Sequence, residues 1–316
     1  MNQFFEITLS VILPIFLVMS FGYLITKVVT LDLGSLSKLN FYVFIPVFMF
    51  YSLLIFKPGN REISMTIIFN LLLACLSFAV MYGLTRWMRF SPNLAAASTL
   101  GVMIFNSANY GIPVINLFLF GDEHVQGEGV AIQVITITTM NIITYTLGVL
   151  LMGGWSEWKK GIQTILKLPI IYALIAALLL RGFDVMLPDP LMTSLKWTAD
   201  GMMSIALLTL GAQLGQAGIS LRHPKELWIT ISARLLAGPL LAFALLKLFI
   251  LMHLMEPGLL AKVLFISSSF PTAVATVLFG IEYDKEPTFA ADVVFITTLL
   301  SAVTVSLAIK LAPTFF

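Results

Sequence analysis

The sequence predicts an all-α polytopic membrane protein with ten transmembrane helices in two inverted five-helix repeats, the fourth helix of each repeat being broken. Three observations lead to this fold class. Hydrophobic residues make up 59% of the 316 residues and charged residues 11%, whereas a globular domain is about half apolar and a quarter charged. The apolar residues form runs of the length that a bilayer requires. Features of the first half of the chain also recur at a constant distance in the second half.

The apolar runs give the number of helices. A bilayer core about 30 Å thick needs roughly 20 apolar residues per helix. Ten runs bounded by charged or Gly/Pro-containing breaks satisfy this requirement: 7–26, 36–56, 64–85, 94–119, 130–152, 163–180, 198–214, 227–252, 259–280 and 290–312. The first run is too long, and too weakly basic in front, for a cleaved signal peptide, so we expect it to be the first span. An even number of spans puts both termini on the same side of the membrane.

Lys and Arg residues in the short loops predict the orientation. Loops on one side carry 10 of these residues and loops on the other side carry 6, with Arg234 and Lys247 left inside a span. The positive-inside rule then places both termini of this multi-pass protein outside the cytoplasm, in the cell (plasma or inner) membrane. The acidic stretch "GDEHVQGEG", residues 121–129, becomes an outer loop under this orientation.

Several function classes are excluded by what the chain contains. A single cysteine, Cys75, excludes intramolecular disulfides and thiolate metal clusters. The formal net charge of +2 indicates no nucleic-acid partner. The three histidines lie in loops or at a span edge, and the chain has no H-E-x-x-H motif and no G-x-S-x-G elbow. We therefore expect no enzyme, no catalytic residue, no cofactor and no metal site.

An internal repeat relates the two halves of the chain. Pro113 and Pro271 lie 158 residues apart, and "ITTM" at 137–140 recurs as "ITTL" at 296–299 at nearly the same offset. Each half would hold five spans, and an odd number per half forces the two copies into opposite orientations. We therefore expect a first repeat at 1–152, a cytoplasmic linker at 153–162 and a second, inverted repeat at 163–316.

The fourth and ninth spans are the interrupted ones. A proline inside a helix frees backbone groups, which in hydrocarbon must be satisfied by protein, water or a ligand. Asparagine amides and serine hydroxyls near such a break could hold a small polar solute, and the N-termini of half-helices would favour an anion. The candidate binding residues are Asn106, Asn109, Gly111 and Pro113 in the fourth span, and Ser267, Ser268, Ser269 and Pro271 in the ninth.

These residues also have a purely structural interpretation. One proline in a transmembrane helix is most often a kink, and Ser or Asn there often joins helices by hydrogen bonds. A pair of interrupted segments at corresponding positions of two inverted repeats instead indicates the central site of a secondary transporter. We favour the transporter for the matched pair.

Ionisable residues bear on the charge of the solute. The middle of each predicted span lacks Asp and Glu, so coupling is left to uniport or to an acid at a span edge, such as Asp200 or Asp292. Arg234 is the basic residue well within a span. Its guanidinium could balance an anionic substrate, or it could bind backbone carbonyls at a helix end. Broken helices without central acids favour an anion over a cation in either case.

The motif around the first break resembles a known family. "FNSANYGIPVINLFLFGDE", residues 105–123, is similar to the Asn- and Gly-rich motif of the auxin efflux carrier family, which includes plant auxin exporters and bacterial permeases for small dicarboxylates. "LTLGAQLG" at 208–215 and "PTAVATVLFGIEYD" at 271–284 resemble later family stretches in the same order. One departure is Phe105, where the family usually has glycine.

The resemblance implies fold, mechanism and partners. It implies two inverted five-helix repeats with broken, crossing fourth and ninth helices, as in the bile acid symporter and sodium–proton antiporter folds, divided into a scaffold and a transport domain. It implies alternating access of the elevator type for a small organic anion, such as a carboxylate, an auxin-like acid or a dicarboxylate. The site would lie at Asn109, Gly111 and Pro113, with Asn106 and Pro271 as neighbours, in a lipid-embedded homodimer.

Two other transport mechanisms are the alternatives. A sodium-coupled symporter of the bile-acid type shares the architecture, but its ninth-helix acid has no counterpart among Ser267, Ser268, Ser269 and Thr272. A channel could also be lined by Asn and Ser, although the inverted repeat with two interrupted spans suits alternating access better. An intramembrane enzyme with a nucleophile among the three serines is the weakest alternative, because no base lies near them in sequence.

Overall fold

The structure is a computed structural model that describes residues 3–216, 218 and 220–316. Helices dominate these residues, as the composition predicts. Across this described part of the chain, the extended backbone is limited to one isolated antiparallel bridge between Phe105 and Thr272, and there is no strand. The all-α prediction is therefore confirmed.

Within the described residues, six helical rods are long and apolar enough to cross a membrane, and a bent pair of helices makes a seventh. Four of these rods contain a π-helical segment between two α-helices. The rods are α1 (Gln3–Ile7), η1 (Thr8–Ile12) and α2 (Leu13–Ile25); α3 (Leu33–Leu39), η2 (Asn40–Phe44) and α4 (Ile45–Ile55); α5 (Asn60–Trp87); α8 (Glu123–Ile143), η3 (Thr144–Gly148) and α9 (Val149–Gly153); α13 (Pro224–Ser232), η5 (Ala233–Ala237) and α14 (Gly238–Leu251); and α17 (Pro287–Phe315). The π-helical segments η1, η2, η3 and η5 thus recur through the bundle.

The fourth and ninth apolar runs are each divided into two short helices. The fourth run forms α6 (Pro92–Met103) and α7 (Gly111–Phe118), and the ninth forms α15 (Leu259–Ser268) and α16 (Ala275–Glu282). The interruptions at 104–110 and 269–274 lie where the asparagine, glycine and proline residues predict them. The short halves also explain why these two runs are absent from the six long rods.

The sixth and seventh runs differ in detail from the sequence prediction. The expected linker at 153–162 is largely helical, because η4 (Trp155–Glu157) leads into α10 (Trp158–Ile165). The next helix, α11 (Pro169–Gly182), is bent by 49° from the segment before it. The bend occurs at Pro169, which is a favourable first residue for a helix but cannot continue one. The seventh run forms α12 (Asp189–Gln216), which is longer and more polar at its start than predicted.

The acidic stretch at 121–129 is also more ordered than a loop. Helix α8 begins at Glu123, so most of the stretch forms the first turns of that helix. The carboxylate of Asp122 accepts hydrogen bonds from the backbone amides of His124 and Val125, both at 3.1 Å. Such an N-cap satisfies amides that have no partner within the helix.

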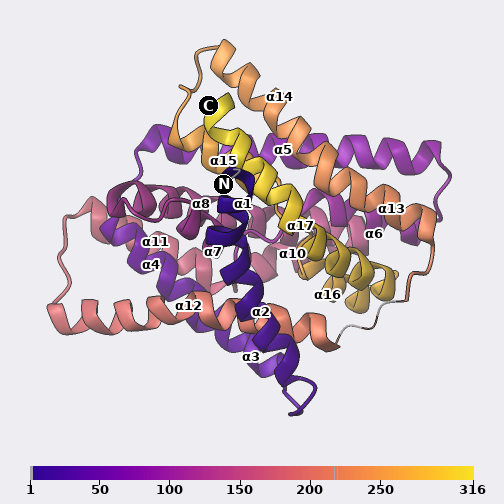
Figure 1. Cartoon of the computed structure of the whole chain (residues 1–316), viewed down its shortest axis with the longest axis horizontal. Helices are drawn as coiled ribbons and strands as arrows, with labels where there is room; N and C mark the ends of the chain where they lie inside the picture. Colours follow the sequence, from indigo (N-terminus) through magenta and orange to yellow (C-terminus); the bar gives the residue numbers. More distant parts are fainter. Residues whose placement is uncertain (1–2, 217, 219) are drawn as a thin grey trace.

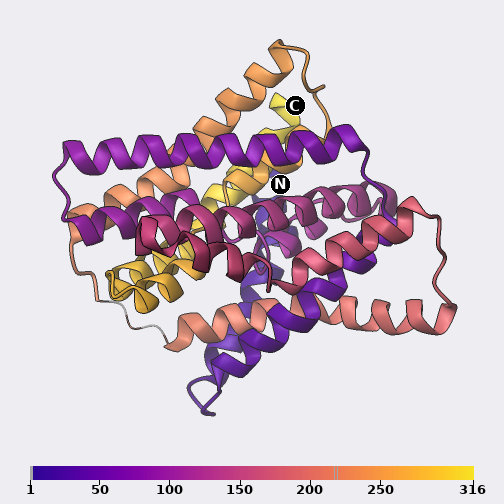
Figure 2. The same cartoon turned by 180° about the vertical axis from the view of Figure 1, so that it is seen from behind.

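Two groups of helices can be distinguished by their packing. Helix α12 packs along α2 and α4, and α11 packs on α4; we call these four helices the α12 group. Helices α5, α6, α7, α8, α15, α16 and α17 pack on one another, and we call them the break group. Figures 1 and 2 show α5 and α12 at opposite sides of the molecule, with α8 between them.

Glycines explain the close contact of α2 with α12. A Cβ at Gly22 would collide with the backbone carbonyl of Leu208, and one at Gly211 would collide with that of Met19. Small residues let two membrane helices approach until their backbones touch, which maximises van der Waals contact. The α12 group is therefore joined by backbone-to-backbone packing.

Burial separates central helices from peripheral ones. The most apolar windows of the rods containing α8 and α17 are 61% and 56% buried, against 22% for the rod that contains α2. Exposed side chains on the peripheral rods are largely apolar, including Phe21, Leu24, Leu71 and Leu240. A helix that presents apolar residues outward is suited to lipid rather than water. The chain ends lie close together, because Gln3 and Pro313 line one cavity.

Candidate functional site

The two breaks meet each other. The backbone amide of Asn106 donates to the carbonyl oxygen of Pro271 at 2.8 Å, and the amide of Ala273 donates to the carbonyl oxygen of Ile104 at 3.3 Å. Phe105 and Thr272 form the antiparallel bridge between these two bonds. Backbone groups that the helices leave unpaired are thus satisfied across the break, as a lipid environment demands. Segments that are far apart in sequence form one structural centre.

Pro113 and Pro271 occupy different places relative to the breaks. Pro113 lies in the first turn of α7, where a missing amide costs nothing. Pro271 lies in the extended segment between α15 and α16, and its carbonyl oxygen accepts the hydrogen bond from Asn106. One proline therefore starts the second half of its span, and the other supplies an acceptor at the crossing.

Asn109 stands at the half-buried edge of the first break. Its Oδ1 accepts a hydrogen bond from Nδ2 of Asn40 at 3.0 Å. Asn40 is buried in η2 of the second rod, and its own Oδ1 has no partner among the described residues. π-helical segments frequently occur at functional sites. Asn40 is not among the candidate residues predicted from the sequence, although an amide in an apolar run is itself a signal.

Asn106 and Gln133 are the buried amides beside the breaks. The Nδ2 of Asn106 is buried without a hydrogen-bond partner among the described residues. The fully buried side chain of Gln133, on α8, donates from Nε2 to the carbonyl oxygen of Ser107 at 2.7 Å and accepts from Oγ of Ser267 at 2.6 Å. Gln133 thus connects the first break to the end of α15.

The three serines of the ninth span differ in their partners. Ser267 bonds to Gln133, whereas Ser268 and Ser269 donate to carbonyl oxygens of their own helix, Phe265 and Ile266, both at 2.5 Å. All three side chains are buried. Serines that bond back to their own helix commonly bend or end it. Ser268 and Ser269 therefore satisfy carbonyl oxygens in the last turn of α15.

Gly111 is required by close packing at the start of α7. A Cβ there would lie 2.6 Å from Nε2 of Gln133 and 2.7 Å from the ring of Phe270. The amide of Gly111 donates to the carbonyl oxygen of Asn106 at 3.1 Å. Tyr110, just before it, packs edge-on against Phe270 with ring centroids 5.7 Å apart. This packing fixes the direction in which α7 leaves the break.

Arg234 lies on η5 with its guanidinium against the ends of two half-helices. Its Nη1 donates to the carbonyl oxygen of Val102 at 2.7 Å, and its Nη2 donates to the carbonyl oxygen of Ser268. The side chain is 1% exposed, and it lies 5.3 Å from the centroid of the Phe105 ring. These contacts correspond to the second of the two roles expected for Arg234, the binding of backbone carbonyls at helix ends.

The two acids considered for coupling lie in different surroundings. Asp200 forms an exposed ion pair with Lys196 at 2.7 Å on α12. Asp292 is fully buried on α17, where its Oδ1 accepts from the amide of Ser220 at 3.0 Å. The two breaks themselves contain no Asp or Glu. Among the described residues, no cluster of His, Cys, Asp and Glu has the composition of a metal site.

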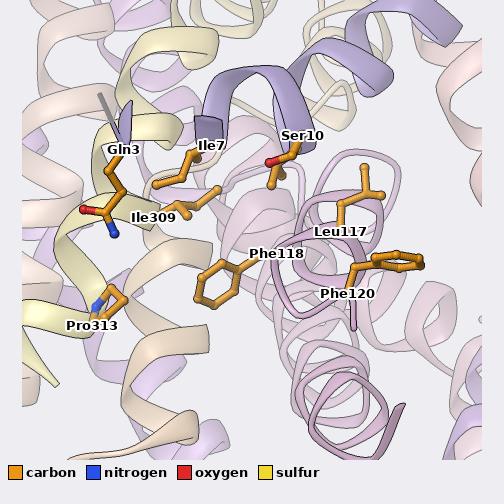
Figure 3. Close-up of a pocket in the computed structure, with 9 residues that line it drawn as sticks. Gln3, Ile7, Ser10, Leu117, Phe118, Phe120, Ile309 and Pro313 are labelled. Carbon is orange, nitrogen blue, oxygen red and sulfur yellow. The ribbon is translucent and has the colours of Figure 1, made fainter. Parts of the chain in front are cut away.

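A cavity of about 330 Å³ lies beside the C-terminal end of α7. Figure 3 shows its lining residues, which include Ile7 and Ser10 of the first rod, Phe118 of α7 and Ile309 of α17. None of the predicted site residues lines it. Apolar side chains in its lining stand beside the polar side chains of Gln3 and Ser10.

Comparisons with known proteins bear on the family and on the internal repeat. A model of the family described as "Membrane transport protein" matches residues 7–164 and 158–309, close to the two halves predicted from the repeat. An uncharacterized transporter of Methanocaldococcus jannaschii is 26% identical over 210 residues. That match covers 65% of this chain and 64% of the relative, so the chain spans less than two thirds of the relative's length.

Proposed function

Because this chain belongs to the membrane transport protein family, which is the auxin efflux carrier family that its motifs resemble, it is a transporter, and we propose that its substrate is a small organic anion. The observation that carries the proposal is the meeting of the two breaks beside the half-buried amide of Asn109. Interrupted helices that meet in a membrane protein form the typical substrate site of secondary transporters.

The groups at the crossing favour an anion. The breaks contain no carboxylate, whereas Asn106 has a buried and unpartnered amide donor. A carboxylate substrate would accept a hydrogen bond from this donor and from the neighbouring amides of Asn109 and Asn40, each of which can also rotate to donate. A cationic substrate would find no negative side chain at these segments. The polar groups therefore match a carboxylate better than an amine.

The proposed mechanism is alternating access of the elevator type. In this mechanism the break group carries the site past the α12 group, which is held rigid by the glycine contacts between α2 and α12. The family match to both halves supports two inverted five-helix repeats and ten spans. The bond between Asn40 and Asn109 joins the second rod to the first break. In this mechanism that bond breaks and reforms during each cycle.

Uptake by proteoliposomes tests the substrate class. The purified protein is reconstituted, and uptake of labelled mono- and dicarboxylates is compared with that of amines of similar size. We expect saturable uptake of at least one carboxylate and none of the amines. Transport of amines alone would refute the anion, and ohmic single-channel currents would identify a channel.

Asn109→Ala tests the site. Loss of one hydrogen-bonding amide at the crossing should raise the KM for the transported carboxylate about three- to tenfold, since such a bond contributes about 1 kcal/mol. The matched control is Asn93→Ala, an exposed asparagine in the first turn of α6. A normally folded N109A protein with an unchanged KM would remove Asn109 from the site.

A further inference from the structure

Arg234 brings a positive charge to the inner ends of two half-helices. The carbonyl oxygens of Val102 and Ser268 belong to the last turns of α6 and α15, and both converge on one guanidinium. Carbonyls in the last turn of a helix have no partner within it, and each helix end carries about half a negative charge. Two such ends that meet in a lipid-embedded protein need a compensating cation.

The Arg234 guanidinium has no acidic partner in the part of the chain that the structure describes. Among the described residues, none of the ion pairs includes Arg234. Its side chain is almost completely buried, so bulk water does not solvate the guanidinium. A buried unpaired charge is costly, and here the two carbonyl dipoles are the groups that offset it. The helix ends and the guanidinium therefore stabilise each other.

Two neighbouring residues, Gly238 and Phe105, fit closely against the guanidinium of Arg234. Gly238 lies one turn after Arg234, and a Cβ there would lie 3.1 Å from Nη2 and 3.3 Å from the central carbon of the guanidinium. On another side the ring of Phe105 contacts the cation. Phe105 is also the position at which this chain departs from the family motif. Glycine at 238 and phenylalanine at 105 together make a fitted site for a planar cation.

In transporters with broken helices, the C-terminal ends of half-helices and unwound carbonyls commonly bind a sodium ion. We propose that Arg234 is a tethered cation that takes the place of such an ion between α6 and α15, so that this transporter works without sodium. The part of this inference that concerns sodium-independent transport rests on the proposed function. The compensation of the helix-end charges by Arg234 does not depend on any substrate. Arg234 is thus a positioning residue for the crossing.

Chemical rescue tests the tethered cation without any substrate. Arg234→Ala should leave a polar cavity, and free guanidinium in the low millimolar range should raise the thermal unfolding midpoint of this variant. Arg234→Met should show no such rise, because its thioether fills the space. Arg61→Ala is the matched control, since Arg61 also donates to two carbonyl oxygens, those of His253 and Leu254, but is exposed.

The outcomes of the rescue are decisive. A midpoint that guanidinium leaves unchanged in R234A, or raises equally in R234M, would overturn the proposal. An Arg234 that served only to bind the substrate would likewise show no rescue in the absence of substrate. If R234A cannot be purified, Arg234→Lys decides, because an ammonium can retain contact with the carbonyls. R234K should then unfold at a higher temperature than R234M, and the reverse order would contradict the inference.

A second measurement tests sodium independence. Carboxylate uptake by the wild-type protein is measured with sodium and after its replacement by N-methylglucamine, at constant pH. We expect equal initial rates, and a rate that falls more than about tenfold without sodium would overturn the proposal. If no carboxylate is transported at all, the proposed substrate class is wrong. The guanidinium rescue would still show whether Arg234 is the tethered cation.

Discussion

Single amide side chains connect the breaks to helices outside them. Asn40 reaches Asn109 from the second rod, and Gln133 joins Ser107 to Ser267 from α8. Each contact crosses a large distance in sequence and lies where water is scarce, so an amide left without its partner would be costly. The geometry of the crossing thus depends on residues that lie outside the motif.

Removal of the Asn40 amide tests its part in the site. Asn40→Ala leaves Asn109 without its hydrogen-bond donor, so the Asn109 side chain should lose its fixed orientation. We expect a KM about three- to tenfold higher for the transported carboxylate, measured by uptake into proteoliposomes. Asn60→Ala, at an exposed position on α5, should leave the KM unchanged. An equal effect of both substitutions would argue against a specific role for Asn40.

Gly111 offers a test of packing. Gly111→Ala places a methyl group against Gln133 and Phe270, and such overpacking typically costs about 1–3 kcal/mol. We expect a lower unfolding midpoint in detergent. The control is Gly83→Ala on α5, where a Cβ would meet nothing within 4 Å, and where alanine should stabilise the helix by about 0.5–1 kcal/mol. A G111A protein as stable as G83A would contradict the described packing.

Residues at the crossing were easier to predict from the sequence when they act on their own segment of the chain than when they act through a distant partner. Asn109, Gly111 and the two prolines lie in or beside the breaks, and their residue types are typical of interrupted helices, so the sequence alone could indicate where the breaks lie. The contacts of Asn40 and Gln133 with the breaks could not be predicted from the sequence, because their partners are 69 and 26 residues away. Both appear in the sequence only as single amides in otherwise apolar runs.

Features of the helices were likewise predictable from the sequence when their cause is local, and not when it lies in the packing of neighbouring helices. Prolines mark the starts of α6, α11, α13 and α17, where the missing amide is harmless. The two breaks were predictable for the same local reason. The π-helical segments and the bend before α11 were not, because they depend on how neighbouring helices pack. Hydropathy gives only approximate helix boundaries, so the sequence predicts a loop at residues 121–129, where α8 in fact begins at Glu123.

The start of α3 gives a pH-dependent prediction. The Ser35 hydroxyl, then the Ser35 and Gly34 amides, hydrogen-bond to Asp32 and lower the pKa of its carboxyl from 3.8. A group with a depressed pKa stabilises the folded state above its unfolded pKa, and the contribution is lost as the pH falls through the folded pKa. Asp32→Ala should therefore lower the unfolding midpoint at neutral pH.

The difference between D32A and wild type should shrink as the pH falls from about 5 to about 3, where the carboxylate becomes protonated. Asp32→Asn is the control, because its amide oxygen can still cap the helix but does not titrate in this range. A difference between D32A and wild type that stays constant across this range would show that the carboxylate is not the capping group.

The whole molecule combines an α12 group, joined by close glycine contacts, with a break group that holds the crossing. The family match covers both halves, yet ten spans and their orientation stay predictions from hydropathy and loop charge. The described residues contain six rods and one bent pair that qualify by length and composition. Interrupted spans escape that criterion because their halves are short. Arrangement across a membrane is a property of the assembled helices, which composition alone does not encode.

Topology can be measured on intact cells. The even number of spans and the loop charges predict that both ends of the chain lie outside the cytoplasm. Alkaline phosphatase fused after Phe316 should therefore be active, and green fluorescent protein fused there should be dark. A fluorescent fusion with an inactive phosphatase would reverse the orientation while leaving the fold unchanged.

Cys75 is the sole thiol of the chain, and it lies exposed on α5, in the break group. The natural protein can therefore be labelled at one site for spectroscopy without the removal of other thiols. One introduced cysteine at an exposed position of α12, such as Trp197→Cys, would complete a spin-label pair across the two groups. If the break group travels, the distance distribution should be bimodal and should shift when a carboxylate is added. A single unshifted distance would describe a molecule whose two groups do not slide.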